Sequence, residues 1–312
     1  MPAVKRIRPT EIFPADQVAR LRTVSRWKGL ALVAHAWVMI GLCVVVASWL
    51  DNPLWTLLLV PVVGARQLGV SILMHEGAHG LLHPDRRLND RVGHWLCGAP
   101  IGSDLVAYRN YHLQHHKFTQ QPEDPDLVLS APFPIGRASM RRKILRDLTG
   151  RTFLKQKLQL MGAAIGREGV ETNTQRVARR TLRDWFIVNA TVTALFGFIA
   201  GVEGIALWWV SQATWFPLSL RIRNIAEHAC IDTGDDPFAH ARTTHAAWWE
   251  KALLAPYWVH YHAEHHLFMY LPCYNLPAAH KLLVQGGHAE KMTFAPGYIA
   301  VLRMAAGTPA AA

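Results

Sequence analysis

Residues 29–50 read GLALVAHAWVMIGLCVVVASWL and carry no formal charge if His35 is neutral. The run is longer than the roughly 18 apolar residues that indicate a membrane-spanning helix. Residues 54–74 form a second apolar run, although Arg66 stands near its middle. The Asp-Asn-Pro sequence at 51–53 is a turn signal between the two runs. Together the two runs predict a helical hairpin in a membrane.

A longer apolar stretch, residues 185–220, is interrupted by Gly-Val-Glu-Gly at 201–204. It is too long for one span of about 20 residues, so it predicts a second hairpin that turns at this tetrapeptide. The expected spans are therefore about 29–50, 54–74, 185–201 and 204–220. Residues 137–183, by contrast, are polar and are expected to form a solvated helical linker.

The chain of 312 residues is 51% hydrophobic and 18% charged, which is more apolar than an ordinary soluble domain. Its net charge of +11 could indicate nucleic-acid binding, but the basic residues gather before residue 29, between the hairpins and just after residue 220. The positive-inside bias then places residues 1–28, 75–184 and 221–312 in the cytoplasm, together with both termini. We therefore expect an integral membrane protein with no nucleic-acid partner.

Four histidine clusters carry the chemistry: HEGAH at 75–79, HLQHH at 112–116, His228 in NIAEH, and HAEHH at 262–266. Residues three and four apart share a helix face, so each multiple cluster is expected to be a metal clamp. The predicted topology places every cluster on the cytoplasmic side. The candidate ligands are His75, His79, His112, His115, His116, His228, His262, His265 and His266. Nine imidazoles exceed what one tetrahedral ion binds, so they predict two metal ions with higher coordination numbers.

Polar neighbours of the clusters are candidates to support these ligands. Asn224 lies four residues before His228, on the same helix face, and is expected to support a metal directly or through water. Asp124, Asp126 and Glu264 are candidates to accept hydrogen bonds from imidazole N–H groups. The other histidines, which include His83 and His260, are expected to have surface, capping or packing roles.

The HEGAH sequence also fits the HExxH pattern, in which two histidines hold zinc and the glutamate acts as a general base. An intramembrane zinc protease would need a third ligand and would leave seven of the nine histidines without a role. A membrane protein that binds metal without turnover is a further alternative. The number of bound metal ions would separate these alternatives.

Taken together, HEGAH, HLQHH, NIAEH and HAEHHLFMYLPCYNLPAAH resemble the membrane fatty acid desaturase superfamily, from about Leu73 to Leu283. ARTTH and LPCYNLPAAH look like its bacterial branch, which implies a bacterial inner membrane. The resemblance implies an all-α protein with four transmembrane helices in two hairpins and a cytoplasmic helical cap that holds two irons. It also implies one domain over residues 1–312, with the nine histidines as iron ligands and Asn224 supporting a metal through water.

The activity implied by this resemblance is an O₂-dependent oxidation that desaturates a fatty acyl chain in a lipid or acyl carrier. A hydroxylase or ketolase of the same superfamily, acting on a lipid or carotenoid, stays open, because HEGAHG, RLND and PEDPD also look like that branch. The chain shows no GxGxxG fingerprint, no cluster-binding cysteine set and no haem segment. A separate electron donor, of the ferredoxin or cytochrome b5 type with its reductase, is therefore expected.

Overall fold

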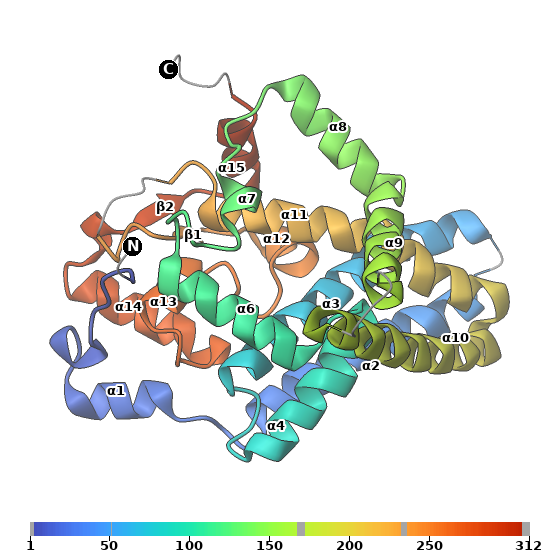
Figure 1. Ribbon diagram of the computed structural model, residues 1–312, viewed down its shortest axis with the longest axis horizontal. Helices are drawn as coiled ribbons and strands as arrows, with labels where there is room; N and C mark the ends of the chain where they lie inside the picture. Colours follow the sequence, from blue (N-terminus) through green and yellow to red (C-terminus); the bar gives the residue numbers. More distant parts are fainter. Residues whose placement is uncertain (1–2, 51, 167–171, 232–235, 308–312) are drawn as a thin grey trace.

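The computed structural model describes residues 3–50, 52–166, 172–231 and 236–307, so the predicted turn residue Asp51 lies outside the described residues. The chain is predominantly helical (Figure 1). The longer helices are α1 (Ala15–Arg22), α2 (Lys28–Ser48), α3 (Pro53–His79), α4 (Arg86–Val92), α6 (Leu105–Phe118), α8 (Arg137–Leu148), α9 (Arg151–Ile165), α10 (Asn173–Ala213), α11 (Trp215–His228), α14 (Leu276–Gln285) and α15 (Tyr298–Ala305). The shorter ones are η1 (Pro9–Glu11), the π-helical η2 (Gly93–Gly98), α5 (Ala99–Ile101), α7 (Leu127–Ser130), α12 (Trp248–Leu253), α13 (His262–Leu267), η3 (Cys273–Asn275) and η4 (Ala289–Lys291).

Two short strands depart from the all-helical expectation. Strand β1 (Arg242–Thr244) pairs in parallel with β2 (Thr293–Ala295), and Arg242 lies opposite Thr293. An isolated bridge joins Thr243 to Tyr261, the residue immediately before α13. The small sheet therefore ties the C-terminal segment to the start of the last histidine motif.

Among the described residues, three helical segments are long and apolar enough to cross a membrane: Lys28–Ser48, Pro53–His79 and Asn173–His228. Their shared core includes Ile40 and Val44 of α2, Val63 of α3, and Leu207 and Trp208 of α10. Many large apolar side chains of these helices point outward instead, among them Val38, Leu42, Leu54, Leu57, Leu58, Phe186, Leu195 and Phe198. Such an apolar exterior is suited to lipid rather than water.

The chain reverses direction inside α10. Ala200 and Gly201 leave the helical conformation, and Gly201 has φ 56° and ψ −142°, a region that glycine reaches without strain. Trp208 Nε1 then donates to Asn189 Oδ1 at 2.9 Å, although residues so far apart on a straight helix would be separated by more than ~20 Å. The observed turn begins at Ala200, one residue before the predicted turn, which begins at Gly201. The predicted fourth span, 204–220, is divided at Thr214, where α10 gives way to α11.

The remaining helices form a cap around the ends of α3 and α11. Buried side chains of α3 and α11, such as Leu73 and Ile225, share a core with Tyr298 of α15. A second core joins Leu21 of α1 to Leu283 of α14 and to residues around α13. In Figure 1, α6 and α13 lie beside each other below α11. The cap therefore brings four segments that are distant in sequence to one place.

Candidate metal centre

Each histidine cluster lies on or at the end of a helix, as its spacing predicted. His75 and His79 occupy the last turns of α3, and His228 is the last residue of α11. The HLQHH sequence lies in the second half of α6, and HAEHH makes up most of α13. The structure brings all nine side chains together in two groups.

The first group consists of His75, His79, His112, His116 and His265, whose ligand atoms lie within 4.8 Å of one another. His116 Nε2 lies 2.9 Å from His112 Nε2 and 3.0 Å from His265 Nε2. His75 Nε2 and both ring nitrogens of His79 are buried, and among the described residues they have no hydrogen-bond partner. A cation between these nitrogens would satisfy the unpartnered atoms, because a metal accepts the ring lone pairs that otherwise face each other.

The second group consists of His115, His228, His262 and His266, again within 4.8 Å. His228 Nε2 lies 2.9 Å from His262 Nε2 and 3.2 Å from His115 Nε2. His115 Nε2 also lies 3.3 Å from His266 Nε2. The two groups are adjacent, since the rings of His116 and His266 are 4.4 Å apart between centroids. The nine histidines therefore form two neighbouring nitrogen-lined centres.

The HLQHH and HAEHH motifs each divide between the two groups, so neither motif lies within a single group. In α6, His112 and His116 join the first group while His115 joins the second. In α13 the assignment is the opposite. His265 joins the first group, and His262 and His266 join the second. Residues four apart differ by only about 40° around the helix, whereas the residue at i+3 points about 100° away from the one at i+4. Each motif can therefore reach both centres.

Burial keeps the imidazoles of the cap neutral. It lowers the pKa of His112, His116, His262, His265 and His266 well below 6.5, and neighbouring histidines lower it further by repulsion. A neutral imidazole is the form that binds a metal. These five histidines are therefore in the protonation state that a metal requires.

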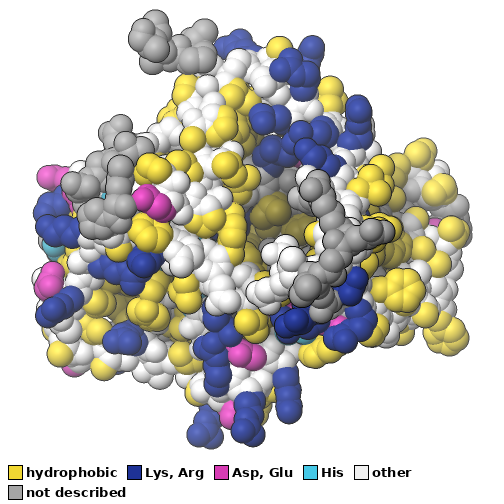
Figure 2. Space-filling view, viewed as in Figure 1, with side chains coloured by type: hydrophobic (Ala, Val, Ile, Leu, Met, Phe, Trp, Pro, Cys, Tyr) yellow, Lys and Arg dark blue, Asp and Glu magenta, His cyan; other side chains and the backbone are white. Residues whose placement is uncertain are grey.

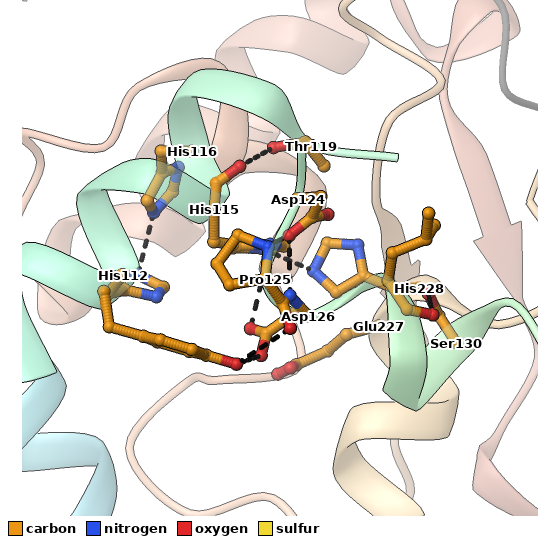
Figure 3. A network of polar contacts seen from close by, with 12 residues as sticks. His112, His115, His116, Thr119, Asp124, Pro125, Asp126, Ser130, Glu227 and His228 are labelled. Atoms are coloured by element: carbon orange, nitrogen blue, oxygen red, sulfur yellow. Dashed lines mark hydrogen bonds and ion pairs between the residues drawn. The ribbon is translucent and has the colours of Figure 1, made fainter. Parts of the chain in front are cut away.

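The Nδ1 atoms of several histidines face acceptors outside the two groups. His115 Nδ1 lies 2.8 Å from Asp124 Oδ1, as Figure 3 shows. His262 Nδ1 lies 3.4 Å from Glu227 Oε1, and His228 Nδ1 lies 3.3 Å from the carbonyl oxygen of His240. An Nδ1–H that donates outward leaves Nε2 unprotonated and turned inward. This arrangement selects Nε2 as the ligand atom.

The predicted supporting residues are only partly in these positions. Asp126 lies 3.7 Å from His115 Nδ1 and accepts from Tyr111, so Asp124 is the nearer partner. Asn224 is half-buried on α11. No hydrogen bond from Asn224 to the nine histidines occurs within the described residues.

Glu264 was expected to support a ligand, but it binds His280 and Thr243 instead. The reason is helical geometry, because Glu264 is two residues after His262 and points to the opposite side of α13. His83 and His260 were expected to have surface, capping or packing roles. His83 accepts from the backbone N–H of Asp85. His260 is buried and belongs to neither group.

Three residues near the ligands were not identified from the sequence: Glu227, Arg223 and Arg109. Glu227 is buried next to His262 and accepts from Arg223 Nε at 2.6 Å. Arg109 of α6 donates to the carbonyl oxygens of Ala78 and Gly77, which fixes the end of α3 against α6. The clues were present, since Glu227 lies within NIAEH and Arg109 lies one turn before HLQHH.

The carboxylate of Glu76 in HEGAH accepts a backbone hydrogen bond and does not face an open space. Its Oε2 accepts from the backbone N–H of Cys273 at 2.8 Å, and its Oε1 lies 3.6 Å from His75 Nδ1. The side chain is buried, at 3% exposure. A general base in an HExxH site needs access to a metal-bound water, so this placement does not favour the zinc protease alternative.

A cavity of about 370 Å³ opens beside the two histidine groups. Its lining includes His112 of the first group and His115, His228 and His262 of the second. Helices α3, α6, α9 and α11 all contribute to the wall, which also includes Asn224. Figure 2 shows the molecule hollowed between these helices, with hydrophobic side chains at the floor. A molecule in this cavity would contact imidazoles of both groups.

Comparison with known proteins gives two findings. The sequence profile of the family described as Fatty acid desaturase matches residues 52–297. The chain is also similar to dihydrorhizobitoxine desaturase from Bradyrhizobium elkanii. The two are 25% identical over 298 residues, which cover 91% of this chain and 79% of the relative.

Proposed function

Because the chain belongs to the fatty acid desaturase family, as its histidine motifs predicted, we propose that it is a membrane-bound di-iron oxidase that desaturates an acyl chain. The observation that carries the proposal is the cavity that reaches imidazoles of both histidine groups. The relative's name states that it desaturates dihydrorhizobitoxine, which supports desaturation as the reaction type.

The donor set fits two iron ions. Nine imidazoles in two adjacent groups, with buried nitrogens on His75 and His79 that have no hydrogen-bond partner within the described residues, suit a pair of ions that accept nitrogen ligands. The five histidines of the first group and the four of the second would hold one iron each. When bound, an iron pair supplies the reduction of O₂ and the oxidising power that removal of hydrogen from an unactivated C–H bond requires.

The protein's own contribution is position and exclusion of water. The overall change converts CH₂–CH₂ into CH=CH while O₂, two external electrons and two protons become two waters. Apolar side chains at the cavity wall, such as Phe216 and Leu220, would hold the acyl chain of the substrate. The histidine side of the cavity would receive the carbons to be oxidised. Whether the substrate loses two hydrogens or gains an oxygen then depends on how its acyl chain is held.

For the topology, we propose that the two arms of α10, which reverse at Ala200 and Gly201, act with α11 as the second pair of spans. With α2 and α3 this gives four spans, with both termini and the histidine centre on the cytoplasmic side of a bacterial inner membrane. Electrons would come from a separate donor of the ferredoxin or cytochrome b5 type. Basic side chains on α8 and α9, including Arg142, Arg146 and Arg151, offer an acidic donor a complementary surface.

Metal analysis of the purified protein tests the site, and mass spectrometry tests the reaction. About two irons per chain and a product two mass units lighter than its substrate are expected. One zinc per chain would contradict the proposal and favour the protease. Two irons with a product sixteen units heavier would show the hydroxylase alternative, which shares the metal centre but inserts oxygen.

A further inference from the structure

The cavity beside the histidines contains charge as well as apolar surface. Its lining includes four charged side chains other than histidine, Asp126, Lys157, Arg223 and Glu227. Leu129, Leu160, Phe216 and Leu220 supply apolar surface in the same cavity. A ligand that fills it must therefore combine an apolar part with a group that satisfies any unpaired charge.

These four charged side chains differ in the partners they have. Glu227 accepts from Arg223 Nε at 2.6 Å, and Asp126 accepts from the Tyr111 hydroxyl. Lys157 differs, because within the described residues no carboxylate lies close enough to form an ion pair with it. Its ammonium donates to the carbonyl oxygen of Ile101 at 3.2 Å and lies 4.5 Å from the centre of the Trp185 ring. Lys157 is therefore a cation of the cavity wall that has no carboxylate partner within the described residues.

The surroundings of Lys157 leave space for its ammonium group. A Cβ at position 102 would lie 2.3 Å from Lys157 Nζ, so only a glycine at that position permits the approach. Gly102 also has φ +80°, a conformation that other residues adopt with strain. Burial lowers the pKa of Lys157 to about 8, which reflects a cation that lacks a negative partner. An anionic ligand would supply that partner.

We propose that the substrate is a compact free acid whose carboxylate binds Lys157, while its chain lies along the apolar wall toward the histidines. This inference rests on the proposed function and narrows its substrate class. Gln156 and Ser103 line the same cavity, and a side-chain amide and a hydroxyl can both donate to carboxylate oxygens. A volume of about 370 Å³ is at the small end of ligand pockets, which typically hold ~300–1,000 Å³, so it suits one short chain better than a whole lipid.

The first experiment locates the product. Cells that express wild-type protein, Lys157→Gln or Lys155→Gln are separated into a water-soluble acid fraction and a lipid extract, and both are searched for species two mass units lighter. Lys155 is an exposed lysine on the same helix and is the matched control. We expect the product in the acid fraction for wild-type and Lys155→Gln, and a strong loss for Lys157→Gln. A product confined to the lipid extract, with equal yield in all three, would overturn the carboxylate assignment.

The second experiment measures binding, with octanoate and its neutral analogue octanamide titrated calorimetrically into the purified iron-loaded protein. Loss of a charge-assisted hydrogen bond should weaken octanoate binding about 10- to 100-fold in Lys157→Gln. Lys157→Arg should retain most of the affinity, and Lys155→Gln should match wild type. Octanamide should bind wild type and Lys157→Gln equally. Equal octanoate affinity in wild type and Lys157→Gln would refute the inference.

Separate controls keep failure of the inference apart from failure of the proposed function. Thermal unfolding midpoints of the variants exclude a folding defect as the cause of lost binding. Two irons per chain and a desaturated lipid, without octanoate binding, would overturn the carboxylate assignment and leave the desaturase function intact. An absence of bound iron would overturn the proposed function itself.

Discussion

His115 Nδ1 lies 2.8 Å from Asp124 Oδ1, so the carboxylate accepts the ring N–H and leaves Nε2 for a metal. Asp124 also accepts from the backbone N–H groups of Gln120 and Asp126, which fixes its orientation. We predict that Asp124→Asn lowers iron affinity about 10- to 100-fold, the usual cost of removing such a partner. Iron retained after dialysis against a graded chelator series measures the effect.

The matched control is Asp85→Asn, which changes a capping carboxylate on α4, outside the two groups. Asp126→Asn should have a smaller effect than Asp124→Asn, because Asp126 lies 3.7 Å from the ring nitrogen. Equal iron affinity in wild type and Asp124→Asn would show that this contact does not orient the ligand.

The division of the histidine motifs between two groups gives a second prediction. His265→Ala removes a ligand of the first group, and His262→Ala, three residues away on α13, removes one of the second. Each variant should lose activity and should bind iron at fewer than two per chain, with the protein still inserted in the membrane. His83→Ala is the control, since His83 lies outside both groups and should keep both irons. Full activity in either ligand variant would contradict the di-iron assignment.

The sequence predicted the parts of this site that depend on local geometry. The i, i+3 and i, i+4 spacings identified eight of the nine histidines, because side-chain direction on a helix is set by residue number alone. His228, which stands alone in NIAEH, was identified from its place one helical turn after Asn224. Spacing could not assign His115 and His116 to different centres, because that depends on where α11 and α13 lie. The same limit explains Glu264, which a sequence argument placed near the ligands and the fold turned toward His280.

The stretch 137–183 shows a different limit. Its polar composition predicted a solvated linker, yet α9 lies against the cavity and carries Lys157 into its wall. A lysine in a polar helix is usually exposed, and nothing in the residues nearby distinguishes Lys157 from Lys155. The distinguishing feature is Gly102, which is distant in sequence and contacts the ammonium only in the folded chain.

The reversal within α10 gives a prediction about topology. Glu203, just beyond the turn at Gly201, should lie on the side of the membrane opposite to the histidine centre. Glu203→Cys should react with a membrane-impermeant maleimide in intact spheroplasts, whereas Lys155→Cys should react only after permeabilisation. Wild-type protein gives the background, since three of its cysteines are buried and Cys230 is half-buried. Protection of Glu203→Cys in spheroplasts, with labelling after permeabilisation, would refute four spans.

The lowered pKa of Lys157 predicts how substrate capture depends on pH. Burial lowers that pKa from 10.5 to about 8, so the ammonium that would bind a carboxylate is lost as the pH rises through about 8. The value of kcat/KM, which reports groups of the free enzyme, should therefore fall above pH 8. In Lys157→Arg this fall should disappear, because a guanidinium stays charged. The other charged side chains that line the same cavity, Asp126, Arg223 and Glu227, are unchanged in that variant.

Unfolding caused by Lys157 cannot produce the same fall. Between pH 8 and 10.5 the unfolded chain binds more protons at this lysine than the folded chain does, since its folded pKa is the lower one. The contribution of Lys157 to the free energy of unfolding therefore increases with pH across that window. A decline in kcat/KM with an unchanged melting temperature would assign the effect to substrate capture. Identical pH profiles for wild type and Lys157→Arg would show that another group controls it.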